Sequence, residues 1–261
     1  MSLPPARLRA VCGLALAAAT LLTVPGCLTR EPERAAAEPG AVPSPSAGRR
    51  AEGRTPDLTA AQAQDALITM ADLGASWGPT QGAATWRDGL LKATTDMPEC
   101  QQLMDALYTE ELFGDAPGTH AVTALDDGDA GGQLRYQVAT RGPAAVNRTL
   151  AWLNGLPQTC GRFTAKSQSA GELDVQVSEI ELPQVGDARQ GLRITLTGAT
   201  TSEDDESSAL TLEVAAARVG EDAIVVTNGT LGEVSEDATD QALELGTQRL
   251  TRIREQGRTQ T

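Results

Sequence analysis

The residues of this chain whose side chains can most clearly take part in covalent chemistry are its four cysteines. Cys27 follows a cationic start with Arg7 and Arg9, the apolar run 10–24, and a small-residue site. These are the parts of an export signal, and they predict a signal peptide over residues 1–26. An ordinary secretory peptide and an uncleaved anchor helix are the alternatives, although a membrane span needs ~20 apolar residues.

The cysteine-ended site resembles the lipobox of bacterial lipoproteins. In that family the cysteine thiol receives a diacylglyceryl group and becomes the new N-terminus after cleavage. The family usually has Leu and then a small residue where Val24 and Pro25 stand here, so we expect slower processing. Two acyl chains hold a protein stably at a membrane. The resemblance therefore implies lipidation of Cys27 and attachment to the extracytoplasmic face of the cell membrane.

Cys100 and Cys160 are the two cysteines left for a disulfide, since Cys12 lies in the signal peptide and Cys27 carries lipid. Two cysteines in an oxidising compartment favour one bond, with two buried thiols as the alternative. The bond would close a long loop and contribute on the order of 4 kcal/mol by the chain-entropy estimate.

Charge and composition restrict the partners and the domain boundaries. The formal net charge is −14, and loss of residues 1–26 makes it about −16, which argues against a nucleic-acid partner. Residues 27–56 are mostly Ala, Pro, Ser, Glu, Arg and Gly. They cannot bury enough apolar surface to fold, so we predict a disordered tether followed by one domain over residues 57–256.

Residues 57–256 show helical and strand periodicity in turn. Apolar spacing predicts helices over 58–73, 98–112, 143–154 and from Ser235 to about 254. Alternation predicts a hairpin and further strands, over 120–125, 133–140, 173–177, 192–196, 210–214 and 224–226. This order predicts an α+β domain, with a mainly antiparallel sheet and helices packed on one face.

Motifs for catalysis and metal binding are weak. The chain has no G-x-S-x-G, no H-E-x-x-H and no phosphate-binding glycine loop, and a Ser-His-Asp enzyme would have to use His120, the only histidine. The acidic runs with Asp126, Asp127 and Asp129, and Glu203 to Glu206, offer oxygen ligands to calcium but lack the spacing of an EF-hand loop. We therefore expect no enzyme activity, no cofactor and no metal site.

Trp77 and Trp86 are the best candidates for a ligand surface, because they lie in a glycine-rich, turn-forming stretch. A rigid aromatic covers apolar ligand surface at little entropic cost. Trp152, by contrast, lies on a predicted amphipathic helix and is expected in the core.

Short motifs in the predicted domain resemble the extracellular sensor domain of PknH-type serine/threonine kinases and related actinobacterial lipoproteins. The matching segments are 66–74 with Trp77, 98–100, 144–153 leading to Cys160, 185–187 and 218–222. The resemblance implies an antiparallel sheet with packed helices and a cleft, outside the membrane, that binds an undefined extracellular ligand. Kinase members often carry two disulfides, whereas one pair is available here.

These features favour a lipid-anchored, non-enzymatic ligand-binding or sensor-like lipoprotein. We expect a small-molecule or lipid ligand or an envelope protein as partner, and sensing would need a membrane partner. The alternatives are a carboxylate-dependent envelope hydrolase and a purely structural envelope interaction protein. Two carboxylates facing each other across an aromatic-lined cleft would favour the hydrolase, and a flat apolar patch would favour the structural protein.

Overall fold

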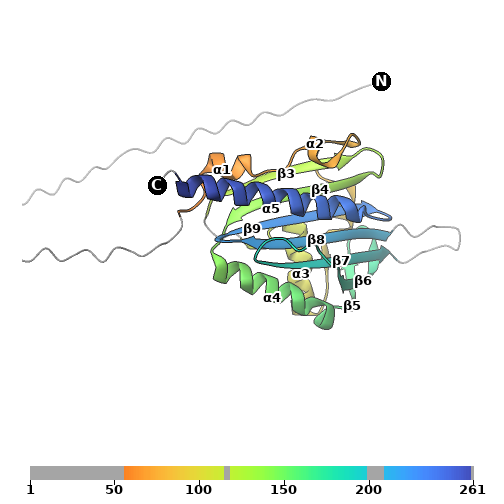
Figure 1. The fold of residues 1–261 in the computed structure, drawn as a ribbon. Helices are drawn as coiled ribbons and strands as arrows, with labels where there is room; N and C mark the ends of the chain where they lie inside the picture. The colour runs from red at the N-terminus through yellow and green to blue at the C-terminus, as the bar shows by residue number, and fades with distance from the viewer. Residues whose placement is uncertain (1–55, 115–117, 199–208, 260–261) are drawn as a thin grey trace, which may run out of the picture. The chain divides into compact units, whose positions relative to one another are not determined.

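A nine-stranded antiparallel sheet forms the centre of the computed structural model, which describes residues 56–114, 118–198 and 209–259 (Figure 1). The strand order is β1-β3-β4-β9-β8-β7-β6-β5-β2. The strands are β1 (Trp77–Pro79), β2 (Ala93–Thr94), β3 (His120–Asp127), β4 (Gly132–Thr140), β5 (Arg162–Ser167), β6 (Gly171–Glu179), β7 (Ala188–Gly198), β8 (Ala209–Val219) and β9 (Asp222–Leu231). The antiparallel sheet and the α+β class predicted from the sequence are confirmed.

Glycine-containing turns join the central strands. Gly131 lies in the turn between β3 and β4 with φ +65°, and its N–H donates to Asp127 O at 2.9 Å. Gly220, with φ +61°, lies in the tight turn between β8 and β9, where Val219 pairs with Asp222. Glycine adopts positive φ without the strain that other residues meet, so both predicted hairpins form.

Helices precede, interrupt and follow the strands. They are α1 (Ala60–Asp65), α2 (Met70–Leu73), the π-helical turn η1 (Arg87–Leu91), α3 (Pro98–Thr109), α4 (Pro143–Thr159) and α5 (Glu236–Thr259). The single helix predicted over 58–73 is divided, because Thr69 is extended and begins α2, with its N–H and hydroxyl donating to Asp72. The predicted end of α4 at Gly155 was wrong, because the buried stripe of this helix continues to Leu156.

The helices cover both faces of the sheet, where the sequence predicted one (Figure 1). On one face, called the α4 face, α3 and α4 pack against Leu212 and the other strand residues that point to the same side. On the opposite face, called the α5 face, α1 and α5 pack with Ala215 and Ile224. The difference arises in the central strands, which are apolar on both faces. The outer strands β5 and β6 alternate between buried and exposed residues and so show the one-sided pattern.

A buried Tyr–Gly contact lets α5 lie close to the sheet. Tyr136 on β4 is fully buried, and its hydroxyl donates to Ala66 O at 3.4 Å. A Cβ built on Gly246 of α5 would lie 2.1 Å from the Tyr136 hydroxyl, so this helix position needs glycine. Burial raises the pKa of Tyr136, and the charge of Arg249 acts in the opposite direction.

Buried and partly buried ion pairs attach α5 to the rest of the domain. Asp222 is fully buried and accepts from Arg254 Nη2 at 2.6 Å and from Thr140 Oγ1 at 2.8 Å. Arg249 Nη2 lies 2.5 Å from Asp72 Oδ1 and so ties α5 to α2. These contacts hold the C-terminal half of α5 against α2 and against β9.

A second polar cluster lies beneath the N-terminal half of α5. Glu213 on β8, with its side chain 1% exposed, accepts from Arg193 Nη2 at 2.8 Å and from Thr239 Oγ1 at 2.6 Å. Asn228 Nδ2 donates to Thr239 Oγ1 at 3.1 Å and to Ser235 O at 3.1 Å. The buried carboxylate is therefore paired and hydrogen-bonded, as a buried charge requires.

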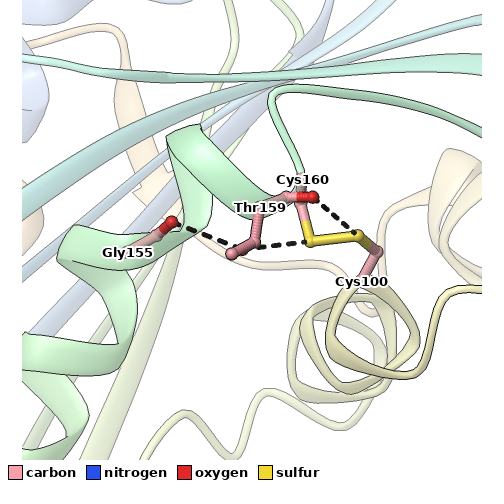
Figure 2. The surroundings of a disulfide bond; sticks show 4 residues. All are labelled: Cys100, Gly155, Thr159 and Cys160. Atoms are coloured by element: carbon pink, nitrogen blue, oxygen red, sulfur yellow. Dashed lines mark hydrogen bonds between the residues drawn. A yellow bond between two sulfur atoms is a disulfide. The ribbon is translucent and has the colours of Figure 1, made fainter.

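The disulfide between Cys100 and Cys160 joins α3 to the end of α4 (Figure 2). Their Cα atoms are 5.6 Å apart, and both residues are fully buried. At the end of α4, the Thr159 hydroxyl donates to Gly155 O at 3.3 Å. The pairing predicted from the sequence is thus present in the structure.

Candidate ligand-binding groove

A groove of about 610 Å³ lies on the α4 face of the sheet, beyond the area that α3 and α4 cover. One wall is the strap, residues 80–86, which connects β1 to η1. The other walls are the end of β3, the start of β4 and the end of β9. The residues lining this Trp86 groove are Gln81, Gly82, Ala83, Ala84, Thr85, Trp86, Asp126, Asp127, Ala130, Gly131, Gly132, Gln133, Thr230 and Leu231.

Trp86 is half-buried, with its indole packed between the groove and the α4-face core. A Cβ built on Gly229 of β9 would lie 3.0 Å from Trp86 Cη2 and 2.3 Å from Leu212 Cδ2. The missing side chain at Gly229 therefore creates the space on the sheet that the indole occupies. Close approach of this kind is the usual reason for glycine inside a strand.

Gln133 on β4 anchors the strap to the sheet. Its Nε2 lies 2.8 Å from Thr80 Oγ1, 2.9 Å from Gly82 O and 2.9 Å from Asp126 Oδ1, and its Oε1 accepts from Ala84 N at 3.3 Å. One amide side chain thus contacts three positions of the strap and the neighbouring strand β3. These hydrogen bonds set the position from which the chain continues to Trp86.

Asp126 on β3 is the half-buried carboxylate of the groove. Its Oδ2 accepts from Gln81 N at 2.8 Å, and its Oδ1 accepts from Gln133 Nε2. Burial acts to raise the pKa of Asp126, but hydrogen bonds from Gln133, the Gln81 N–H and Thr80 outweigh it, and the pKa lies below its ordinary value. The groove therefore contains an ionised carboxylate at neutral pH.

A charged cluster borders the groove along the same sheet face. Glu110, the residue after α3, bridges Arg87 Nη1 at 2.9 Å and Arg135 Nη1 at 2.8 Å. It has φ +58°, and its carbonyl accepts from Gln137 Nε2 at 2.9 Å. Desolvation lowers the pKa of Arg135. The charge of Glu110 opposes this shift, and the charge of Arg87 adds to it. A backbone strained in this way persists only where surrounding contacts hold it.

His120 lies beyond this cluster and outside the Trp86 groove. It is exposed at the start of β3 and lines a separate hollow of about 160 Å³ with Arg135, Gln137 and Phe113. No serine or threonine hydrogen-bonds to it among the contacts found in the described part of the chain. The structure thus separates the only histidine from the aromatic groove.

The two tryptophans predicted to form a ligand surface lie on opposite faces. Trp77 on β1 is only 8% exposed and packs in the α5-face core with Ile68 and Leu125, so its predicted place in a ligand surface was wrong. The cause is cover from α2, which contacts β1, and from α1, which contacts the neighbouring strand β3. Trp86 does line a groove. Trp152 packs against the α4-face core, as its helical position predicts.

The predicted acidic runs fall in different parts of the chain. Asp126 takes part in the strap contacts, and Asp127 Oδ1 accepts from Asp129 N at 3.1 Å in a local turn. Within residues 56–114, 118–198 and 209–259, no group of three or more His, Cys, Asp or Glu side chains could hold a metal ion. The run Glu203 to Glu206, Cys27 and the predicted tether before residue 56 lie outside the described residues.

Sequence reasoning missed Gln133, Arg135 and Gln137. They alternate along β4 with Leu134, Tyr136 and Val138, a pattern typical of a strand with one solvated face. In the structure the strap and the residues after α3 cover that face instead. A signal did exist, since Gly229 inside an apolar strand marks a close approach, but its partner Trp86 is far away in sequence.

Comparison with known proteins finds structural likeness only. No family model and no curated protein matches the chain. The extracellular domain of PknH from Mycobacterium tuberculosis has 12% identity and a TM-score of 0.47, covering 77% of this chain and 100% of that one. A putative uncharacterized protein from Mycobacterium smegmatis has 16% identity and a TM-score of 0.39, with the same coverage. An extracellular domain of the PknH type, which the short motifs resemble, is thus among the solved structures to which the chain is similar. None of the helices in the described residues is long and apolar enough to cross a membrane.

Proposed function

We propose that this chain is a non-enzymatic ligand-binding lipoprotein, anchored through Cys27 at the extracytoplasmic face of the cell membrane, with the Trp86 groove as its ligand site. The observation that carries this proposal is the groove itself. It combines an aromatic wall, created by the space at Gly229, with a polar base held by Gln133 and Asp126. An apolar surface beside a few placed polar groups is the usual composition of a small-molecule site.

The arrangement of the groove carboxylates supports binding over hydrolysis. Asp126 and Asp127 are neighbours on one strand, so their side chains leave β3 on opposite faces. Hydrolysis by paired carboxylates needs the two groups to face each other across the bond that is cleaved. The Asp126 carboxylate is also already engaged by Gln81 and Gln133.

The anchor part of the proposal is supported by the sequence before Cys27 and has its own test. Metabolic labelling with an alkynyl fatty acid should tag the wild type and should not tag Cys27→Ala. Equal labelling of both proteins would contradict lipidation at this residue and would leave the groove proposal standing.

A thermal-shift screen tests the ligand site. Lipids, muropeptides, sugars and amines are added to the full-length chain in detergent, and a hit should raise the unfolding midpoint with concentration. Ala83→Phe should abolish the shift, because Ala83 is an exposed groove residue and the added ring would fill the site. Ala144→Phe, a matched change at an exposed position of α4, should keep it.

Two outcomes would contradict the proposed function. If Ala83→Phe and Ala144→Phe keep the same ligand-dependent shift, the ligand binds elsewhere. If the hit compound is recovered with a changed mass after incubation with wild type but not with buffer, the protein is an enzyme.

A further inference from the structure

The charge of the Trp86 groove points to the class of its ligand. Its lining includes the carboxylates Asp126 and Asp127 and no lysine, arginine or histidine. Neither carboxylate forms an ion pair within the described part of the chain. Three other acids that are buried or partly buried contrast with them, since Glu110, Asp72 and Glu213 each contact an arginine.

The hydrogen bonds of Asp126 hold its charge without cancelling it. The donors are a backbone N–H and the Gln133 amide, which are neutral groups. A carboxylate has about four acceptor positions, so these bonds leave capacity for a further donor. A charge in a half-buried site also attracts a cation more strongly than the same charge in bulk water does.

The aromatic side of the groove suits an organic cation. Trp86 offers the ring that binds cations best among the aromatic side chains, and Leu231, which is 49% exposed, adds apolar surface at the same groove. We infer that the groove binds an organic ammonium ion, whose N–H groups donate to Asp126 and whose apolar part contacts Trp86. This inference rests on the proposed function, because it uses the same site.

An organic cation fits this lining better than a metal ion does. Calcium takes six to eight oxygen ligands, and magnesium demands an octahedral set. Asp126 and Asp127 leave β3 on opposite faces, and the Asp127 side chain already accepts from Asp129 N. The walls formed by Trp86, Leu231, Ala83 and Ala84 offer apolar surface instead of oxygen ligands.

Three probes of equal chain length separate charge from apolar contact. The full-length chain in detergent is titrated calorimetrically, at low ionic strength, with n-pentylammonium chloride, n-pentanol and sodium pentanoate. The ammonium probe should bind about tenfold more tightly than the alcohol, a difference of about 1.4 kcal/mol. The pentanoate should bind more weakly than both, and added salt should reduce the preference for ammonium.

Paired charge variants assign the effect to one residue. Asp126→Asn should remove the preference for ammonium, since it removes the charge and keeps one acceptor oxygen. Asp129→Asn changes the net charge of the protein equally at an exposed turn residue that does not line the groove, so it should retain the preference. Unliganded thermal midpoints of both variants show whether each is folded.

The results distinguish this inference from the proposed function. If the alcohol binds as tightly as the ammonium probe in wild type, the ammonium inference is overturned, whereas loss of alcohol binding in Ala83→Phe would still support the groove as a ligand site. Ammonium binding that Asp129→Asn and Asp126→Asn weaken equally would also overturn it, because bulk charge would then explain the preference. The wild-type comparison is decisive even if Asp126→Asn does not fold.

Discussion

The two faces of the sheet differ in how completely helices cover them. On the α5 face, Trp77 is enclosed by the N-terminal helices and by β3, and ion pairs through Arg249 and Arg254 attach α5 over the sheet. On the α4 face, α3 and α4 cover only part of the strands, and the strap covers the area near Trp86 through hydrogen bonds to Gln133. The groove lies where helical cover gives way to this strap.

This comparison explains why two tryptophans from similar sequence surroundings have different roles. Trp77 is buried in the α5-face core, so we expect it to stabilise the fold. Trp86 contacts the core with one part of its ring and the groove with another. A binding site needs surface that remains available after folding, and only the incompletely covered face provides it.

Breaking the buried pair on the α5 face should have the largest effect. Arg254→Met leaves Asp222 buried without its cation, which should lower the free energy of unfolding by about 3–5 kcal/mol. Urea denaturation measures the change. Arg252→Met removes an exposed arginine from the same helix and should change stability by less than about 0.5 kcal/mol. Similar losses in the two variants would show that the pair does not hold α5.

Loss of the disulfide, which joins α3 to the end of α4 on the α4 face, should have the next largest effect on stability. Replacing Cys100 and Cys160 by Ala together should lower the free energy of unfolding by about 4 kcal/mol or less. Reductant should destabilise the wild type to a similar extent in urea and should not affect the double variant. If the wild type is equally stable in urea with and without reductant, the disulfide does not contribute to stability as predicted.

The close contact beneath α5 should have a smaller effect. Gly246→Ala places a methyl group against the Tyr136 hydroxyl and should cost about 1–3 kcal/mol. Adding Tyr136→Phe removes that hydroxyl and should restore part of the loss, which a double-mutant cycle in urea would measure. Additive losses from the two changes would mean that α5 is not as close to the sheet as the structure shows.

The pH dependence of the α2–α5 contact should be the smallest effect. Burial acts to raise the pKa of Asp72, but hydrogen bonds from Thr69 and the contact with Arg249 outweigh it and lower the pKa. A lowered pKa stabilises the folded state above the unfolded value of about 4, and this stabilisation is lost as pH falls through the folded value. The difference in unfolding free energy between wild type and Asp72→Asn should therefore be constant from about pH 7 to 5 and should shrink below about pH 4. A difference that grows on acidification would contradict the assignment.

Local patterns predicted the hairpins, the disulfide and the antiparallel sheet, because turns, strand alternation and cysteine count are features of nearby residues or of composition. The features that the sequence did not predict, the burial of Trp77 and the cover over Gln133, depend on contacts between distant segments. Trp77 is buried by elements whose approach to β1 has no local signal, and β4 residues such as Gln133 alternate like solvated residues until the strap covers them. Gly246 and Gly229 mark such approaches, but neither identifies its partner.

Indole N–H resonances test the central claim most directly, because the groove and the closed core each contain one tryptophan. Full-length ¹⁵N-labelled protein in detergent is titrated with n-pentylammonium, and the resonances are assigned through Trp77→Phe, Trp86→Phe and Trp152→Phe. The Trp86 resonance should shift in a saturable manner while the Trp77 resonance stays in place. A saturable shift of Trp77 with Trp86 unchanged would contradict the assignment of the ligand site to the Trp86 groove.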